Sequence, residues 1–218
     1  LQHPESSIIT TFASTLGCKN RVFITNVLYP MVKVYEFLAT GFEEIEALAP
    51  VDILRRGEVE IKTVSITGKQ LVESAHGVTV KADMLFEEVS DWTSVDMLLI
   101  PGGMPGAQNL KEHEGVRRVV REQVESGRRV GAICAGPMVL GAAGILKGKR
   151  ATCYPGFEEY LDGAEYTGEL FTVDGNIITG EGPAATLPYA YRILSFFKDE
   201  NTVSSIEDGM RYTHLMNK

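Results

Sequence analysis

From Lys33 onward, segments with strand character alternate with segments of helical periodicity, and this alternation is the strongest constraint on the fold. Residues 95–100 and 129–133 are short, mostly apolar runs, as expected of strands buried on both faces of a parallel sheet. Residues 115–126, which lie between them, repeat apolar side chains at helical spacing. The pattern predicts an α/β fold with a mainly parallel central sheet, flanked by helices and joined by right-handed crossovers.

The remaining segments complete this prediction. The first helix is expected to kink near Pro50 and to end at Gly57, because proline interrupts a helix and glycine favours its end. Its expected buried side chains are Ile45, Leu48, Ile53 and Leu54. The other expected elements are strands at 32–39 and 59–66, a hairpin-like excursion at 78–80, a hairpin turning at Asp174-Gly175, and helices at 43–56, 136–143, 185–197 and 203–216.

Residues 1–30 differ from the rest of the chain, because they are polar, carry few charges and show no clear period. Met31 is followed at once by the first strand, so we expect 1–30 to be a non-native or extra N-terminal lead-in. An edge strand at 22–28 or a targeting segment is the alternative. One domain is expected at 31–200, with 201–218 as a C-terminal helix of the same domain.

Composition excludes several classes of protein. Hydrophobic residues make up 44% and charged residues 23%, as in globular domains. A net charge of -8 argues against nucleic acid or anionic lipid as the main partner. No stretch approaches the ~20 consecutive apolar residues of a membrane helix. With three cysteines in 218 residues, a disulfide scaffold is excluded and a reducing, cytoplasmic location is expected.

Cys134 is the leading candidate for a reactive residue. It ends the strand at 129–133 and precedes a helix, in the sequence Gly-Ala-Ile-Cys-Ala-Gly-Pro. This arrangement is typical of the strand-to-helix elbow that carries a nucleophilic serine or cysteine. The amino end of a helix beside the sulfur is expected to lower the thiol pKa. A buried structural cysteine is the alternative, and the elbow pattern alone does not decide between them.

Two further segments are expected at the same edge of the sheet. Residues 101–103 follow a buried strand, and the amide of Gly103 beside Cys134 would suit an oxyanion hole, although a simple turn also explains the glycines. Residues 43–46 include three glutamates, which usually serve as dipole partners at the start of a helix. If one of them faces Cys134, an ionised carboxylate raises the thiol pKa and a protonated one lowers it. Because the carboxyl ends of parallel strands meet, the three segments are expected to converge.

The histidines and the other cysteines give weaker signals. None of the four histidines lies near Cys134 in the sequence; His76 is the best placed, and a solvated loop histidine is the simpler explanation for it. Cys153 is either a second thiol in the pocket or an ordinary core residue, and Cys18 lies in the lead-in. No paired cysteine and histidine spacing predicts a zinc site, so neither a metal nor a cofactor is expected.

Together, these segments resemble the ThiJ/PfpI superfamily, in the branch of the parkinsonism-associated protein deglycase. The matching segments run in the family's order from residue 33 to about 197. They are residues 41–46 (Gly-Phe-Glu-Glu-Ile-Glu), 50–56 (Pro-Val-Asp-Ile-Leu-Arg-Arg), 101–103 with 106–110, 132–137 around the cysteine, and Gly182-Pro183. The cysteine segment is the most specific of them.

The resemblance implies a flavodoxin-like sandwich, similar to class I glutamine amidotransferases, that is usually a homodimer. It implies Cys134 as nucleophile and redox-sensitive thiol, with Glu46 as its protonated hydrogen-bond partner. The amides of Gly103 and Ala135 would be the oxyanion donors. Arg56 matches an arginine near the dimer interface of the family.

The family's activities are glyoxalase chemistry without glutathione, deglycation and redox-linked chaperoning, and some members carry a thiamine-biosynthesis label. We therefore expect cysteine-dependent detoxification of reactive α-oxoaldehydes or their glycated adducts, without a cofactor. The alternative is a redox sensor or chaperone that is switched by oxidation of Cys134 and has no turnover.

Several positions depart from the family pattern. Tyr154 stands where relatives carry a histidine, and His76 stands where a basic residue often binds anions. With Gly102 and Pro183, these two residues are the remaining pocket candidates. Ala135 stands where the protease-like branch has histidine, which argues against a peptidase. An amidotransferase would need a downstream His-x-Glu sequence, which is absent.

Overall fold

A seven-stranded sheet runs through the part of the chain that the computed structural model describes, residues 32–217. The strand order is β10-β11-β7-β6-β1-β2-β5, and all neighbours are parallel except β10 and β11. This sheet confirms the predicted fold class. The strands are β1 (Lys33–Leu38), β2 (Glu60–Ser65), β5 (Met84–Leu85), β6 (Met97–Ile100), β7 (Arg129–Ile133), β10 (Phe171–Asp174) and β11 (Ile177–Gly180). The predictions for residues 1–30 lie outside the described residues.

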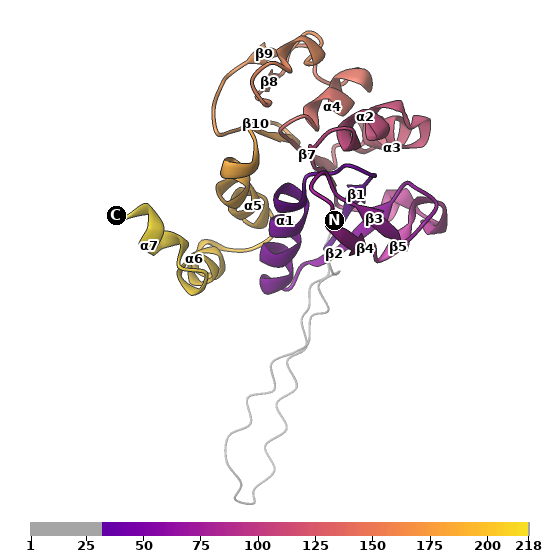
Figure 1. The fold of residues 1–218 in the computed structure, drawn as a ribbon. Coiled ribbons are helices and arrows are strands. Elements are labelled where there is room, and N and C mark those ends of the chain that lie inside the picture. Colours follow the sequence, from indigo (N-terminus) through magenta and orange to yellow (C-terminus); the bar gives the residue numbers. More distant parts are fainter. Residues whose placement is uncertain (1–31, 218) are drawn as a thin grey trace, which may run out of the picture. The chain divides into compact units, whose positions relative to one another are not determined.

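Helices cover both faces of this sheet (Figure 1). On one face α1 packs against α5, and on the other α2, α3 and α4 pack against one another. The central strands β6 and β7 carry the apolar side chains that both layers bury, which explains their nearly continuous apolar sequence. The helices are α1 (Glu44–Arg56), α2 (Gly106–Glu112), α3 (Glu114–Glu125), α4 (Pro137–Ala142), α5 (Thr186–Leu194), α6 (Glu200–Gly209) and α7 (Tyr212–Met216).

Two small sheets stand beside the main one. The strands β3 (Leu71–Glu73) and β4 (Thr79–Lys81) form an antiparallel hairpin, which confirms the excursion predicted around residues 78–80. The strands β8 (Arg150–Ala151) and β9 (Glu165–Tyr166) pair in parallel. The hairpin predicted at Asp174-Gly175 joins β10 to β11, and Gly175 supplies the left-handed conformation that the turn requires (φ 62°).

The burial of α1 differs in part from the prediction. Ile53 and Leu54 are buried as expected, but Ile45 is 54% exposed. Glu46, the next residue, is buried instead. Adjacent helical residues point about 100° apart, so Ile45 and Glu46 face different surroundings. The helix continues through Pro50 and ends at Gly57.

The C-terminal helix predicted at 203–216 is wrong in its bounds. The structure has two helices there, α6 from Glu200 to Gly209 and α7 from Tyr212 to Met216. Arg211 between them adopts a left-handed conformation (φ 64°), which ends one helix before the next begins. No helix within residues 32–217 has the length and apolar character needed to cross a membrane.

Candidate active site

The ends of β1, β6 and β7 meet at one edge of the sheet, as predicted. The amide of Glu43 donates to the carbonyl of Gly102 at 3.0 Å, and the amide of Gly102 donates to Oε2 of Glu46 at 2.8 Å. A Cβ atom at Gly102 would lie 2.6 Å from that Oε2 and 2.7 Å from Cβ of Cys134. The strand β2 follows β1 on one side of the sheet, and β6 lies on the other side of β1. This edge is therefore a topological switch point, where α/β folds place their binding sites.

Cys134 occupies a sharp turn between β7 and α4. Its φ is 61°, an uncommon conformation for a residue with a side chain, and its side chain is largely buried, with 9% of the residue exposed. The amide of Cys134 is held by the carbonyl of Gly180 at 2.9 Å. A Cβ at Gly136 would lie 2.6 Å from the carbonyl oxygen of Ile100, so the turn needs a glycine there. The predicted elbow is therefore present.

Two backbone amides point at the sulfur. The amides of Ala135 and Gly103 donate hydrogen bonds to the Cys134 side chain and act to lower its pKa. Gly103 has a φ of 83°, and a Cβ there would lie 2.3 Å from the amide nitrogen of Glu43. The structure thus places both predicted oxyanion donors beside the sulfur.

Glu46 is fully buried on the first turn of α1. Its amide is capped by Oε2 of Glu43 at 2.7 Å, which fixes the start of the helix and the direction of the side chain. Burial raises the pKa of Glu46 to about 7. The hydrogen bonds of Cys134 and Gly102 act to lower this pKa, whereas the nearby charge of Glu43 adds to the rise. Oε1 is buried without a hydrogen-bond partner among residues 32–217, which also favours the protonated acid.

The thiol pKa differs from the sequence-based expectation. Burial, and then the charge and hydrogen bond of Glu46, raise the pKa of Cys134 to about 12, although the two amides act in the opposite direction. The thiol and the acid therefore titrate together. One proton leaves the pair near neutral pH and the second only at strongly alkaline pH, and the singly protonated pair is a thiolate whenever that proton rests on Glu46.

Tyr154 and Pro183 line one hollow of about 210 Å³. The amide of Tyr154 donates to the carbonyl of Cys134 at 3.0 Å, so one lining residue of the hollow is bonded to the cysteine turn. The hollow is also lined by Glu181, which the sequence analysis missed. Glu181 directly follows β11, and the rule that sites gather at strand ends could have found it.

The structure does not bring His76 to Cys134. This exposed side chain lies on the β3–β4 turn, and its Nδ1 is 3.1 Å from both carboxylate oxygens of Glu44. The hydrogen bond and charge of Glu44 raise the pKa of His76. With Glu43, these two residues place three potential metal-ligand atoms within 4.8 Å of one another. The carboxylate of Glu43 already caps α1, and the His76–Glu44 pair accounts for the remaining charges.

Cys153 lies apart from the pair in its interactions. It is fully buried, and burial, followed by the charge of Glu158, raises its pKa to about 12. The amide of Phe157 donates to it, so its thiol faces the segment that follows rather than Glu46. Cys153 thus has the environment of a core residue.

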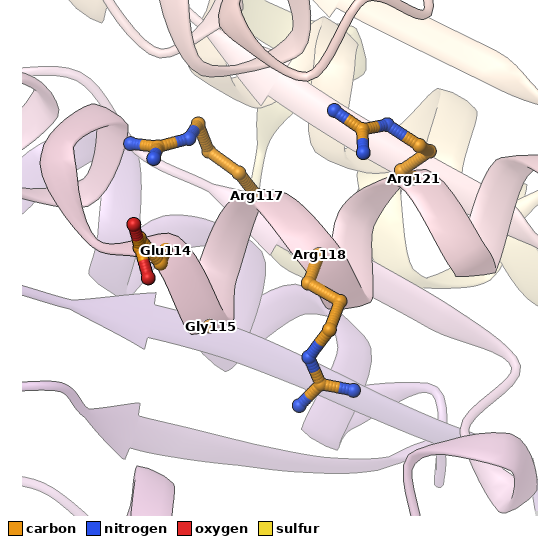
Figure 2. A pocket seen from close by; sticks show the side chains of 5 residues that line it. All are labelled: Glu114, Gly115, Arg117, Arg118 and Arg121. Atoms are coloured by element: carbon orange, nitrogen blue, oxygen red, sulfur yellow. The ribbon is translucent and has the colours of Figure 1, made fainter.

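A second hollow on the surface is bordered by arginines of α3 (Figure 2). Arg117 and Arg121 point to one side of the helix and Arg118 to the other. Arg117 donates to the carbonyl of Lys111 in the last turn of α2, and Arg121 donates to the carbonyl of Ala143 at the end of α4 at 2.8 Å. These two side chains cap the carboxyl ends of neighbouring helices, where a positive charge is favourable. Their guanidinium groups are therefore used in packing.

The fold and this site define a class: an α/β protein with a cysteine elbow whose sulfur meets two backbone amides and a buried glutamate. The model of the DJ-1/PfpI family matches residues 32–195. The chain belongs to the DJ-1/PfpI family. This agrees with the resemblance found from the motifs.

Curated relatives are identical to this chain at about a third of the aligned residues. Protein DJ-1 homolog B of Arabidopsis thaliana is 35% identical over 74% of this chain, which spans only 37% of that relative's length. The Parkinson disease protein 7 homolog of Danio rerio is 35% identical over 72% of this chain and 85% of its own. A solved structure of Schizosaccharomyces pombe DJ-1 superposes with a TM-score of 0.77 at 28% identity, covering 82% of this chain and 98% of that one.

The names of two relatives state an activity. The glutathione-independent glyoxalase DJR-1.2 of Caenorhabditis elegans is 31% identical over 75% of this chain and 87% of its own. The deglycase PH1704 of Pyrococcus horikoshii is 32% identical over 77% of this chain and 100% of its own. Another similar structure is Toxoplasma gondii DJ-1, oxidized, with a TM-score of 0.77 and 30% identity over 82% of this chain and 97% of that one.

Proposed function

We propose that this chain is a cysteine-dependent enzyme of α-oxoaldehyde detoxification, acting as a glyoxalase without glutathione or as a deglycase. The observation that carries the proposal is the pairing of the Cys134 sulfur with buried Glu46 under two backbone amides. The names of the two relatives that state an activity support the choice of substrate. The substrates are small oxoaldehydes or their early adducts, and no metal or cofactor takes part in the proposed route.

The first step is addition to the aldehyde. The Cys134 thiolate attacks the aldehyde carbon, a carbon–sulfur bond forms, and the carbonyl oxygen becomes an alkoxide that takes up a proton to give a hemithioacetal. The amides of Gly103 and Ala135, which already point at the sulfur, stabilise the developing negative charge. The thiolate is available in those singly protonated pairs whose remaining proton rests on Glu46.

The second step moves hydrogen within the substrate. A base takes the proton from the former aldehyde carbon, and a proton is returned to the neighbouring carbon, so that one carbon is oxidised and the other reduced without an external oxidant. Glu46 performs both transfers in this proposal, since its pKa of about 7 suits both directions at neutral pH. Water then cleaves the resulting thioester and releases the 2-hydroxy acid and the free thiol.

The hollow beside Tyr154 supports a small substrate. Its volume of about 210 Å³ is below the usual range of drug-sized pockets, ~300–1,000 Å³. Tyr154 offers a hydroxyl that can donate a hydrogen bond to the substrate. Tyr154 and Glu181 therefore serve to orient the substrate, and the proton transfers belong to Glu46.

Lactate formation from methylglyoxal without glutathione tests this proposal. Wild-type protein should form lactate, Cys134→Ser should form none, and Cys153→Ser, the matched control with the other described thiol, should retain the wild-type rate. Lactate formation by Cys134→Ser, or none by the folded wild type, would reject the proposal.

A redox switch is the second candidate. The similar structure of Toxoplasma gondii DJ-1, oxidized, favours it. Peroxide would take Cys134 through sulfenate to sulfinate, which protonated Glu46 could stabilise by a hydrogen bond. A mass gain of two oxygen atoms on the Cys134 peptide at low peroxide, in protein that forms no lactate, would select this function.

We also infer a cytoplasmic homodimer. Apolar side chains are exposed on α1 and on the neighbouring hairpin, namely Ile45 (54%), Leu71 (64%) and Val78 (46%). The bridge between Phe42 and Ser74 holds this hairpin beside the start of α1. A second copy of the chain would cover these side chains.

A further inference from the structure

Three buried polar atoms lie on the face of the sheet that α1 and α5 cover, and the proposed reaction uses only one of them. They are Oε2 of Glu36 on β1, Oε1 of Glu46 on α1 and the hydroxyl of Tyr189 on α5. None of these atoms has a hydrogen-bond partner among residues 32–217. Buried polar groups almost always have a partner, so three in one layer require an explanation.

The strand register places Glu36 and the Tyr189 hydroxyl on one face. Glu36 pairs with Leu99, and Leu99 pairs with Gly131, so these positions point to the same side of the sheet. A Cβ at Gly131 would lie 2.5 Å from the Tyr189 hydroxyl and 2.8 Å from Cδ2 of Leu99. The hydroxyl therefore rests on the sheet at Gly131, in space that a larger residue would fill.

Glu46 reaches the same layer from α1. Its carboxyl group ends at Gly102, just after β6, the strand that lies between Glu36 and Gly131 in the sheet. Burial raises the pKa of Glu36 and of Tyr189, and the charge of Glu46 raises both further, so the three groups interact electrostatically. Glu36 and Gly131 are two strand spacings of ~4.8 Å apart, which suits a bridge through ordered water.

Glu36 is as deeply buried as Glu46, with 1% of the residue exposed, and its Oε2 has no hydrogen-bond donor within the described residues. Glu46 receives the Gly102 amide and the Cys134 thiol, so Glu46 ionises first. The titratable groups that face Glu36 are Glu46 from α1 and Tyr189 from α5. On the flanking strands its register partners, Thr63 and Leu99, do not titrate. Burial and the charge of Glu46 therefore favour the neutral forms of Glu36 and Tyr189, in which each can donate a hydrogen bond.

We propose that Glu36 and Tyr189 are positioning residues for the Cys134–Glu46 pair, and that they stabilise its single negative charge by donating to Oε1 of Glu46 through enclosed water. Thr186 precedes Tyr189 by one turn on α5, and its buried hydroxyl has no partner in the described part of the chain, so it can complete this water site. This inference rests on the reactive pair of the proposed function. It concerns the protonation of the pair, so it can be tested without an oxoaldehyde.

The test is the rate of Cys134 alkylation by iodoacetamide as a function of pH, read by peptide mass spectrometry. Glu36→Leu removes the donor and should move the midpoint of the profile up by about one pH unit. Glu36→Gln keeps a neutral donor and should restore the wild-type midpoint. Tyr189→Phe should shift the midpoint in the same direction as Glu36→Leu.

Tyr191→Phe is the matched control, because its hydroxyl is also on α5 but contacts Sδ of Met210. It should leave the midpoint unchanged.

An unchanged midpoint in Glu36→Leu and Tyr189→Phe, or equal shifts in Glu36→Leu and Glu36→Gln, would overturn the proposal. Lower midpoints in both Glu36 variants would overturn it too, since they would show an ionised Glu36. If Glu36→Leu does not fold, the alkylation midpoint of Tyr189→Phe compared with that of Tyr191→Phe tests the proposal. The predicted shifts in protein that forms no lactate would reject the proposed function and leave this inference standing.

Discussion

Cys134 adopts a left-handed backbone conformation in which a residue with a side chain costs about 1–3 kcal/mol. The hydrogen bond from its amide to Gly180 and the close packing of Gly136 against β6 hold this conformation. The result is a sulfur that meets the amides of Ala135 and Gly103 at the edge of the sheet. The strain is therefore tied to the position of the candidate nucleophile.

The partner of the sulfur decides its reactivity, and variants of Glu46 test this. Glu46→Gln keeps a neutral donor beside Cys134, whereas Glu46→Ala removes it. The pKa of the thiol should therefore be higher in Ala than in Gln, with each unit equal to about 1.4 kcal/mol of lost thiolate preference. Ultraviolet absorbance of the thiolate during a pH titration measures both values, with Cys134→Ser as the blank. A lower thiol pKa in Ala than in Gln would show that the donor at position 46 does not stabilise the thiolate.

Burial of Glu46 should also make stability depend on pH. Its pKa is raised from 4.5 to about 7, so between these values the folded protein holds a proton that the unfolded chain has released. The free energy of unfolding should consequently fall as pH rises through this window, by about 3 kcal/mol at most. Glu46→Gln lacks this titration, so its stability relative to wild type should grow from pH 4.5 to 7 and then level off. Urea unfolding at several pH values measures the difference, and a constant difference across the window would contradict the raised pKa of Glu46.

Among the structural elements, the loop after β6 leaves the least room for change. A Cβ at Gly102 would press on Glu46, Cys134 and the amide of Ala135 at once. Gly102→Ala should therefore slow alkylation of Cys134 at least tenfold and lower the melting temperature. Gly209→Ala is the matched control, because a Cβ there meets nothing within 4 Å, and it should leave alkylation unchanged. Wild-type alkylation kinetics in Gly102→Ala would mean that this loop does not set the geometry of the pair.

Regular elements were predictable from the sequence where one physical signal dominates. The apolar run at 129–133 became β7 with the same bounds, because burial on both faces fixes both ends. Ile45 was wrongly predicted to be buried, because α1 buries the polar neighbour Glu46 at the site instead. The burial of Glu36 could not be predicted either, because a charged residue inside a strand carries no local sign of burial.

At the scale of the whole molecule, the topology brings the candidate site together. Residues 41–46, 101–103 and 134–136 lie far apart in the sequence, and they meet because β7, β6 and β1 are neighbours in the sheet. Parallel pairing and the strand-end rule allowed this convergence to be predicted. The proton distribution of the pair could not be predicted, because it depends on burial and on partners from three separate segments.

The inferred homodimer gives a prediction at this scale. Ile45→Glu places a charge among the exposed apolar side chains of α1 and the hairpin, and it should shift the protein from dimer to monomer. Leu170→Glu, at a position that is 58% exposed elsewhere, should leave the dimer intact. Sedimentation velocity at several concentrations measures both. A monomeric wild type, or a dimeric Ile45→Glu, would show that this surface is not the interface.

The pH dependence of lactate formation from methylglyoxal tests the central claim most directly, because it joins the chemistry to the proton of the Cys134–Glu46 pair. In wild type, the rate should rise with a midpoint near pH 7, as the pair loses its first proton. Glu46→Gln should lose at least a hundredfold in rate together with that midpoint, since it can donate a hydrogen bond but cannot move a proton. Glu46→Gln with the wild-type rate and pH profile would contradict the account.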